Sequence, residues 1–415
     1  MELKFPVGFL WGTTISAHQA EGGNFNDWTE WEKKNCKQLA ERAKNRWQSW
    51  QQEKFPEMFK PENYISAQTC DFYHRFEKDL DLAQSLNNNA FRFSIEWSRI
   101  EPEEGKFDKN EFNYYRQLIW ACRERNLEPF VTLWHWTLPV WFAKVGGFEN
   151  NQADFYSSRF VKRIVEELGS QVKFWLTLNE PEIYAANSYL KGLWPPQKKN
   201  FYSYLKVLMK LIWLHRKTYK IIKKINPYFQ VGLAKNNVYF EAWQNRPLDY
   251  LLKKAADFWW NYLFLNKTWL YLDFIGLNYY FHNRIKDGRF NQNKNKELSD
   301  LGWEIYPEGI YHVLKGLKRY RKPIYVTENG LADVKDEKRC KFIKEHLFWL
   351  YKAIQEGADV RGYFHWSLLD NFEWDKGFWP RFGLFEVDYR TQERRWRPSA
   401  DYYASICKNN GLEDI

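Results

Sequence analysis

The chain of 415 residues has few cysteines and no long apolar run. Its five cysteines are widely scattered and include no CxxC pair, so the sequence favours neither a disulfide framework nor a zinc site. No stretch reaches the roughly 18 apolar residues of a membrane-spanning helix. Residues 1–12, MELKFPVGFLWG, lack the basic and then apolar pattern of an export signal. We therefore expect a soluble, cytoplasmic protein with reduced thiols, no metal and no membrane partner.

Acidic residues are outnumbered by basic ones, which gives a net charge of +10 and a pI near 9. Such a charge admits nucleic acid as a partner. However, lysines and arginines are mixed with acids along predicted helices, as in KDEKRCKFIK at 335–344, which is typical of a solvated face. The chain also lacks the combined aromatic and basic motif of RNA-binding domains. We expect no nucleic-acid partner, and binding that fell steeply with salt would revive that alternative.

No Ser/Gly linker, low-complexity tract or break in composition divides the chain. Eight short apolar stretches predict strands, at 9–16, 89–97, 128–136, 173–180, 229–237, 273–280, 323–330 and 360–370. Segments with apolar residues at helical spacing alternate with them, at 71–85, 108–125, 152–168, 201–224, 307–321 and 335–356. Continuous apolar strands are typical of a parallel sheet covered on both faces. The sequence therefore predicts one α/β domain over residues 1–415, a (β/α)8 TIM barrel, with a long loop at 23–63 lying over its mouth.

In such a barrel the active site lies at the carboxyl ends of the strands, so polar residues that close a predicted strand are candidate site residues. The two most informative stretches are TLNEP at 177–181 and YVTENG at 325–330, because each places a glutamate at the end of an apolar strand. The strand-end candidates are Gln19, Arg92, Glu96, His135, Trp136, Asn179, Glu180, Asn278, Tyr280, Glu328 and Trp366.

Two carboxylates among amides, an imidazole and aromatic rings, without a metal or nucleotide motif, indicate glycoside hydrolysis. One acid protonates the departing oxygen and the other attacks the anomeric carbon, which retains the anomeric configuration when the carboxyls are about 5 Å apart. An arginine and a tyrosine hydroxyl would keep the nucleophile ionised and fixed, and we assign these roles to Arg92 and Tyr280. The other carboxyl must keep its proton near neutral pH, and Glu180 and Glu328 can raise each other's pKa. The aromatic content, 20% with 23 tryptophans, is compatible with a cleft that stacks sugar rings.

Nearly the whole sequence resembles glycoside hydrolase family 1, the β-glucosidase and β-galactosidase family. The motifs that carry the resemblance are FPVGFLWGTTISAHQAEGG at the start, RFSIEWSRIEPEEGKFD at 92–108, LWHWTLP at 133–139, TLNEP at 177–181, GLNYY at 276–280, GWEIYPEGI at 302–310, YVTENG at 325–330 and GYFHWSLLDNFEW at 362–374. Their order along the chain makes chance similarity implausible.

The resemblance implies a role for each matching position. It makes Glu180 the general acid/base and Glu328 the nucleophile of a retaining β-glycosidase, with Arg92, Asn278 and Tyr280 around the nucleophile. It implies that the sugar is bound by Gln19, His135, Trp136, Asn179, Glu373, Trp374 and Phe382, with Trp366 as the platform under the ring and Trp303 on the leaving-group side. No cofactor is implied, and the expected partners are small β-glycosides or short oligosaccharides.

Two features bear on the substrate. Relatives that cleave 6-phosphoglycosides have a serine in place of Glu373, and a lysine and a tyrosine where this chain has Pro380 and Phe382, so we expect a non-phosphorylated sugar. Relatives that cleave thioglucosides replace the first glutamate by glutamine, whereas Glu180 is retained here. The sequence leaves open the preferred sugar, the leaving group, the oligomeric state and the alternative of a catalytically silent carbohydrate-binding protein on the same fold.

Overall fold

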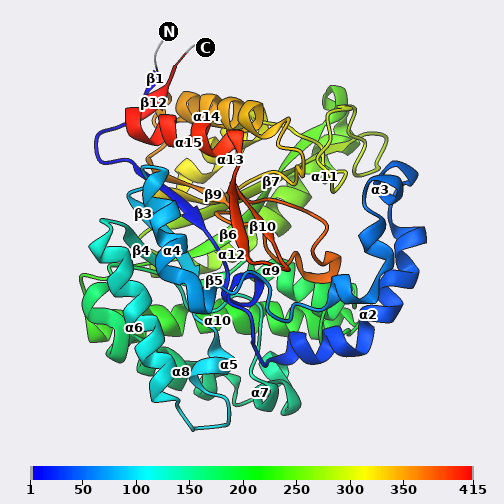
Figure 1. The fold of residues 1–415 in the computed structure, drawn as a ribbon. Coiled ribbons are helices and arrows are strands. Elements are labelled where there is room, and N and C mark those ends of the chain that lie inside the picture. The colour runs from blue at the N-terminus through cyan, green and yellow to red at the C-terminus, as the bar shows by residue number, and fades with distance from the viewer. Residues whose placement is uncertain (1–2, 414–415) are drawn as a thin grey trace.

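A computed structural model, which describes residues 3–413, contains a closed barrel of eight parallel strands in the order β2-β3-β4-β5-β6-β7-β8-β9 (Figure 1). The barrel strands are β2 (Leu10–Thr14), β3 (Ala90–Ser94), β4 (Glu128–Thr132), β5 (Phe174–Asn179), β6 (Gln230–Ala242), β7 (Ile275–Ile285), β8 (Ile324–Asn329) and β9 (Val360–Trp366). Helices follow the strands around the outside of the barrel. The predicted (β/α)8 TIM barrel is therefore confirmed, and each predicted strand overlaps one barrel strand.

The helices are α1 (Ala17–Ala20), α2 (Asp27–Arg46), α3 (Ser49–Lys54), α4 (Phe72–Ser85), α5 (Trp97–Ile100), α6 (Lys109–Glu124), α7 (Val140–Lys144), α8 (Ala153–Leu168), α9 (Pro181–Ala185), α10 (Phe201–Ile225), α11 (Pro247–Ala256), α12 (Leu263–Thr268), α13 (Glu308–Leu317), α14 (Arg339–Gln355) and α15 (Pro398–Asn409). Two antiparallel strand pairs lie outside the barrel: β1 (Leu3–Lys4) with β12 (Gly411–Leu412), and the hairpin of β10 (Phe385–Asp388) with β11 (Glu393–Trp396). The first pair brings the two ends of the chain together (Figure 1).

Aromatic side chains fill the barrel on the side where its strands begin. Phe130 stacks on Phe174 with ring centroids 4.2 Å apart, and Phe274, Tyr325 and Phe364 pack around this pair. Such dense apolar packing leaves room for a polar site only toward the carboxyl ends of the strands. The functional residues described below lie there.

The expectation of a loop at 23–63 is wrong in its local structure, because this segment contains α2 and α3 and two short 3-10 helices. Asn26 and Thr29 form a reciprocal cap at the start of α2. Only a few apolar residues, such as Trp28 and Trp31, mark the buried face of this highly charged helix, so its periodicity is weak. Its packing beside the barrel mouth agrees with the prediction, since Arg46 at its end lies 2.6 Å from Asp375.

Two strands run further than their predicted ends at 237 and 280. Strands β6 and β7 stay paired beyond the barrel rim, as far as Ala242 opposite Ile285, with a register shift after Asn237. The mutual pairing satisfies the backbone groups of both extensions, which explains why polar residues at the rim do not end these strands. Asn278 and Tyr280 consequently lie at the rim of the barrel but inside β7.

Candidate active site

Glu180 follows β5 in a left-handed backbone conformation, with φ 42° and ψ 59°. This conformation is unfavourable for a residue with a side chain, and more so before a proline such as Pro181. A hydrogen bond from the Glu180 N–H to the carbonyl of Ala234, 2.8 Å long, holds it in place, and Pro181 begins α9 directly afterwards. Local strain of this kind persists where the surroundings fix it and is common at functional sites. It places the carboxyl in the cavity at the barrel mouth.

Glu328 lies on β8, one residue before the strand ends. Gly330 lets the chain pass close to the end of β9, since a Cβ atom at this position would lie only 1.8 Å from the Trp366 carbonyl oxygen. Any larger residue would force apart the two strand ends that carry Glu328 and Trp366. The motif YVTENG therefore fixes Glu328, the candidate nucleophile, relative to Trp366, the candidate platform under the sugar ring.

A continuous chain of hydrogen bonds joins the two carboxyls. Arg92, which is fully buried, donates from Nη1 to Glu328 Oε1 at 2.5 Å and from Nη2 to Asn179 Oδ1 at 2.7 Å. Asn278 Nδ2 donates to the same Asn179 oxygen at 3.2 Å and to Glu180 Oε1 at 2.8 Å. From the other side, the Tyr280 hydroxyl donates to Glu328 Oε2 at 2.9 Å. Residues from four barrel strands, β3, β5, β7 and β8, thus fix both carboxyls in one layer.

The environments of the two glutamates differ. Burial and the negative charge of Glu328 raise the pKa of Glu180 to about 8, although hydrogen bonds from Asn278 and Asn236 oppose the shift. Glu328 instead forms a charge-assisted pair with the buried Arg92. The site therefore offers a carboxyl that keeps its proton at neutral pH beside one that faces an arginine, the asymmetry that acid-assisted nucleophilic displacement requires.

A cavity of about 300 Å³ opens above this layer. Eleven of the fourteen predicted site residues line it, namely Gln19, His135, Trp136, Glu180, Tyr280, Trp303, Glu328, Trp366, Glu373, Trp374 and Phe382. The remaining three, Arg92, Asn179 and Asn278, form the hydrogen-bonded layer beneath it. The structure therefore brings all fourteen together, although they come from seven of the eight strands or the loops that follow them.

The polar groups of the cavity wall suit hydroxyl binding. Gln19 Nε2 lies 3.4 Å from Glu373 Oε2, so an amide and a carboxyl stand side by side. His135 Nε2 accepts from Asn179 Nδ2 at 3.0 Å, while burial and then Arg92 lower the pKa of His135 well below its usual range. The imidazole is thus neutral, and its buried Nδ1 has no protein partner among the described residues. Trp374 stacks on His135 with ring centroids 5.8 Å apart and fixes its orientation.

Two positions need comment against the sequence. Asn278 lies opposite Glu328 in the pairing of β7 with β8, as expected of a residue beside the nucleophile, and its amide in addition donates to Glu180 Oε1. With Pro380 where relatives that cleave 6-phosphoglycosides have a lysine, the sequence offers no matching cation for Glu373, and this is corrected by the structure, since Lys376 Nζ is 3.9 Å from that carboxyl. Lys376 is closer to Asp375, at 3.1 Å, so its charge is shared between two acids.

Sequence reasoning missed several residues of the site. Asn236 donates to Glu180 Oε1 at 3.2 Å, and it closes a predicted strand, so the strand-end rule could have found it. Lys191 and Trp194 come from the long connection after β5, and Trp260 comes from the π-helical turn η7 (Asp257–Tyr262). No local pattern shows that such connecting segments turn toward the mouth.

A buried ion pair supports Glu180 from below. Lys235 on β6 is fully buried, lies 3.3 Å from Glu182 Oε1, and donates to the carbonyls of Asn236 and Trp260, each at 2.7 Å. It thereby connects two residues of the cavity wall to the segment that follows Glu180. Burial raises the pKa of Glu182 and lowers that of Lys235, so each depends on the other to remain charged.

We expect Lys235→Met alone to destabilise the fold by about 3–5 kcal/mol, because it leaves the Glu182 carboxyl buried without its partner. The double variant Lys235→Met with Glu182→Leu removes both charges and should recover at least half of that loss. Thermal unfolding followed by circular dichroism measures both variants. A double variant that is less stable than the single one would show that the pair is not the reason for the loss.

Among residues 3–413, no helix is long and apolar enough to cross a membrane, and no group of three or more His, Cys, Asp or Glu side chains is arranged to hold a metal ion.

The sequence matches the model of glycosyl hydrolase family 1 over residues 1–270 and 270–412. A 1,4-β-D-glucan glucohydrolase of Thermotoga neapolitana is 32% identical over 99% of this chain and 100% of its own. β-Glucosidase A of Thermotoga maritima is also 32% identical, over 99% of each chain. More distant relatives, 28% and 29% identical, are a β-galactosidase of Sulfolobus acidocaldarius and a 6-phospho-β-galactosidase of Staphylococcus epidermidis.

Among solved structures, a β-glycosidase from Pyrococcus horikoshii superimposes with a TM-score of 0.88 at 37% identity, covering 100% of this chain and 97% of that one. The likeness thus extends over the entire barrel, including the loops that build the mouth. Because sequence and structure agree over this length, the chain belongs to glycosyl hydrolase family 1.

Proposed function

We propose that this enzyme, which acts on O-glycosyl bonds, is a retaining β-glycosidase with a β-glucosidase-like preference. The observation that carries the proposal is the hydrogen-bonded layer that joins Glu328 to Glu180 through Arg92, Asn179 and Asn278. It holds two buried carboxyls in one cavity, of which Glu180 has a raised pKa and Glu328 faces the Arg92 guanidinium. Two carboxyls of this kind in a sugar-sized cavity supply the acid and the nucleophile of a double displacement.

In the first step the Glu328 carboxylate attacks the anomeric carbon and forms a glycosyl ester. The bond to the leaving-group oxygen breaks at the same time, and Glu180 transfers its proton to that oxygen so that it departs as an alcohol. Arg92 and Tyr280 hold the Glu328 oxygens at 2.5 and 2.9 Å, which limits the motion of the nucleophile before attack.

In the second step the roles of Glu180 reverse. Once Glu328 is esterified, its negative charge is gone and no longer raises the pKa of Glu180. Glu180, now ionised, takes a proton from a water molecule that attacks the anomeric carbon, and Glu328 leaves as a carboxylate. Two inversions at the same carbon restore the original configuration.

Gln19, Glu373 and His135 would bind the hydroxyls of the sugar in the cleaved position, and Trp366 would support its ring. Each of these residues lines the cavity, and Gln19 and Glu373 offer both donors and acceptors at one wall. Because an amide and a carboxyl can bond either epimer of a hydroxyl, the same wall accepts glucosides and, more weakly, galactosides or fucosides. Trp303 and Phe382, whose rings are 6.1 Å apart, line the wall toward the leaving group.

Hydrolysis of nitrophenyl β-D-glycosides tests this function. We expect turnover of the glucoside, galactoside and fucoside, and a preference of about 100-fold for glucoside over glucoside 6-phosphate, because Glu373 repels a phosphate and Lys376 only partly offsets the repulsion. Equal or better turnover of the 6-phosphate would contradict the assignment of the sugar. Silence toward the whole panel by a folded protein would favour a carbohydrate-binding protein without catalysis.

The pH dependence follows from the pKa of Glu180. Because Glu180 must donate a proton, kcat/KM should be maintained below a pKa of about 8 and fall as the pH rises through it. Burial also raises the pKa of Glu373, to about 7, so the two groups must be distinguished. The fall should persist in Glu373→Gln and disappear in Glu180→Gln, measured with a substrate whose leaving group needs no acid. A fall that persisted in Glu180→Gln would exclude Glu180 as its source.

We also propose a reducing, cytoplasmic location. All five cysteines are free thiols, and three of them, Cys70, Cys122 and Cys407, are buried. Thiol labelling tests this proposal. The protein is extracted from cells under conditions that block thiol–disulfide exchange, and is then unfolded without reductant. We expect every cysteine to react with the thiol label.

A further inference from the structure

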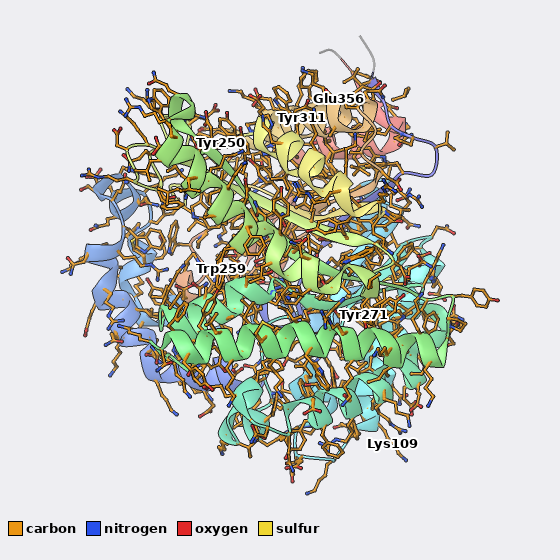
Figure 2. The ribbon with its side chains drawn as sticks, turned by 180° about the vertical axis from the view of Figure 1, so that it is seen from behind. Lys109, Tyr250, Trp259, Tyr271, Tyr311 and Glu356 are labelled. Carbon is orange, nitrogen blue, oxygen red and sulfur yellow. The ribbon has the colours of Figure 1, made fainter. Side chains whose placement is uncertain are left out.

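The exposed apolar side chains of the protein concentrate on one side of the barrel, over α10, the π-helical turn η7 and the short helix η8 (Trp269–Tyr271). Twelve of the twenty-two large apolar side chains that are exposed in the described part of the chain lie between 201 and 270. We call this surface the α10 face and define it by six of them: Tyr202, Met209, Trp213, Phe258, Trp269 and Leu270. Figure 2 looks onto this side, with α10 running across the view and Trp259 and Tyr271 labelled beside it.

Contacts between the elements show that the face is continuous. The Trp259 indole donates to the Tyr204 hydroxyl of α10 at 3.1 Å, and Arg216 of α10 donates to the carbonyl of Lys267, just before η8. On α10 itself, Tyr202, Met209 and Trp213 follow one another at helical spacing along the exposed stripe. Tyr202 is 76% and Leu270 64% exposed, which is unusual for side chains of this size.

Basic residues are concentrated along α10. The helix contains seven lysines and arginines and no acidic residue in 25 positions. Two of the seven, Lys217 and Lys223, form ion pairs with Asp154 and Asp273 from neighbouring segments, so the exposed excess of positive charge comes mainly from the other five. The basic groups surround the aromatic ones, as Lys217 lies 5.0 Å from the Trp213 ring and Lys220 lies 5.5 Å from the Tyr271 ring.

The sequence predicts no membrane partner because it lacks a spanning segment, but the exposed surface points to a different kind of contact. We propose that the α10 face docks on the surface of a bilayer that contains anionic lipids. Exposed tryptophan, tyrosine and leucine side chains within a basic surface are the combination that binds a membrane interface, where apolar groups enter the headgroup region and cations attract the anionic lipids. The helix lies on the membrane and does not cross it, which agrees with the lack of a spanning helix among residues 3–413.

Two other occupants fit the face less well. A second copy of the chain in a twofold contact would bring two basic α10 helices, neither of which contains an acidic residue, against each other, which disfavours association. Nucleic acid would be attracted by the lysines and could stack on tryptophan, but it offers nothing to aliphatic side chains such as Met209 and Leu270. A lipid interface satisfies both the charge and the aliphatic surface.

The docking would place the active site close to the lipid. Trp259, beside the α10 face, precedes Trp260 on the same π-helical turn, and Trp260 lines the catalytic cavity. The mouth therefore opens next to the docked surface and remains accessible from water. Turnover of a small soluble glycoside should accordingly be unchanged when the protein is bound to vesicles.

Flotation of the full-length protein with phosphatidylcholine vesicles, with and without phosphatidylglycerol, tests the proposal. We expect flotation only with the anionic vesicles, and its loss at high salt, where screening shortens to about 3 Å at 1 M. The triple variant Lys206→Glu, Lys220→Glu, Lys224→Glu should reduce the vesicle partition coefficient more than tenfold, since each basic group contributes roughly a fivefold factor. The matched control Lys109→Glu, Lys335→Glu, Lys408→Glu changes the same net charge outside α10 and should retain most binding. Lys109 begins α6, below α10 in Figure 2, Lys335 lies between β8 and α14, and Lys408 lies on α15.

The apolar contribution has its own pair of variants. Trp213→Ser with Leu270→Ser should weaken flotation at least tenfold, whereas Trp120→Ser with Trp396→Ser, which removes two comparably exposed side chains on α6 and β11, should not. All of these positions are exposed, so wild-type hydrolysis of a nitrophenyl glycoside confirms that each variant is folded.

The proposal would be overturned if an α10-face variant and its matched control floated equally, in either the lysine comparison or the apolar comparison. A dimer in analytical ultracentrifugation that dissociates in Trp213→Ser with Leu270→Ser, or tighter binding to single-stranded nucleic acid than to the vesicles, would also overturn it. Failure of the glycosidase proposal would appear separately, as loss of turnover without any change in flotation.

Discussion

Replacing Glu328 by glycine should reduce hydrolysis of nitrophenyl β-glucoside by more than about 10,000-fold, because no other carboxyl can form the covalent intermediate. Among the residues that line the cavity, the other carboxyls are Glu180 and Glu373, and each is fixed by its own hydrogen bonds. The fold should remain, although the buried Arg92 loses its partner. The measurement is the initial rate at saturating substrate, with circular dichroism of the same sample.

A small anion provides the matched control for this variant. Azide can enter the space left by the side chain and attack the anomeric carbon from the same face, which would release nitrophenol and form a glycosyl azide of inverted configuration. We expect azide to restore nitrophenol release in Glu328→Gly and to leave the Glu373→Gly variant unaffected. Wild-type turnover by Glu328→Gly without azide would exclude this residue as the nucleophile.

Glu180→Gln should have an effect that depends on the leaving group. Loss of a general acid costs about 100- to 10,000-fold when the departing oxygen needs a proton, and much less when it leaves readily as an anion. We therefore expect a large loss of kcat/KM for an alkyl β-glucoside and a small one for the dinitrophenyl β-glucoside. Glutamine preserves the shape and can still accept from Asn278, so the layer beneath should stay intact.

The second step of the reaction, hydrolysis of the glycosyl-enzyme, gives a further test of Glu180→Gln. Because Glu180 also activates the attacking water, the glycosyl-enzyme should form with the dinitrophenyl substrate and then accumulate, giving a burst of dinitrophenol followed by a slow steady state. Asn236→Ala serves as the comparison, as it removes one hydrogen bond to Glu180 but leaves the carboxyl. An equal loss for both leaving groups in Glu180→Gln would contradict a role as general acid.

The catalytic pair could be predicted from the sequence because a barrel brings strand ends together. Glu180 and Glu328 each close an apolar strand, and no knowledge of the loops is needed to place them at the same rim. Arg92, His135 and Tyr280 follow from the same rule. The resemblance to family motifs added the residues that come from the loop after β9, such as Glu373 and Trp374, which no strand-end argument reaches.

The remaining features depend on tertiary contacts that leave little trace in local sequence. Helix α2 is rich in charge and is stabilised by its attachment to the mouth, where Trp28 packs on Trp374 with centroids 4.6 Å apart. The hydrogen bond from Asn278 to Glu180 joins residues 98 positions apart, so no local pattern reveals it. Lys376 approaches Glu373 because the turn after β9 folds back on itself, which a motif comparison with serine-containing relatives cannot reveal.

The stereochemistry of the first product tests the central claim most directly. Proton NMR of the enzyme with nitrophenyl β-glucoside, recorded within the first minutes, distinguishes the two anomers of the released glucose before they equilibrate. A covalent intermediate on Glu328 with Glu180 as acid and then base predicts that β-glucose appears first. Initial release of α-glucose would show a single inverting displacement by water and would contradict the roles assigned to both glutamates.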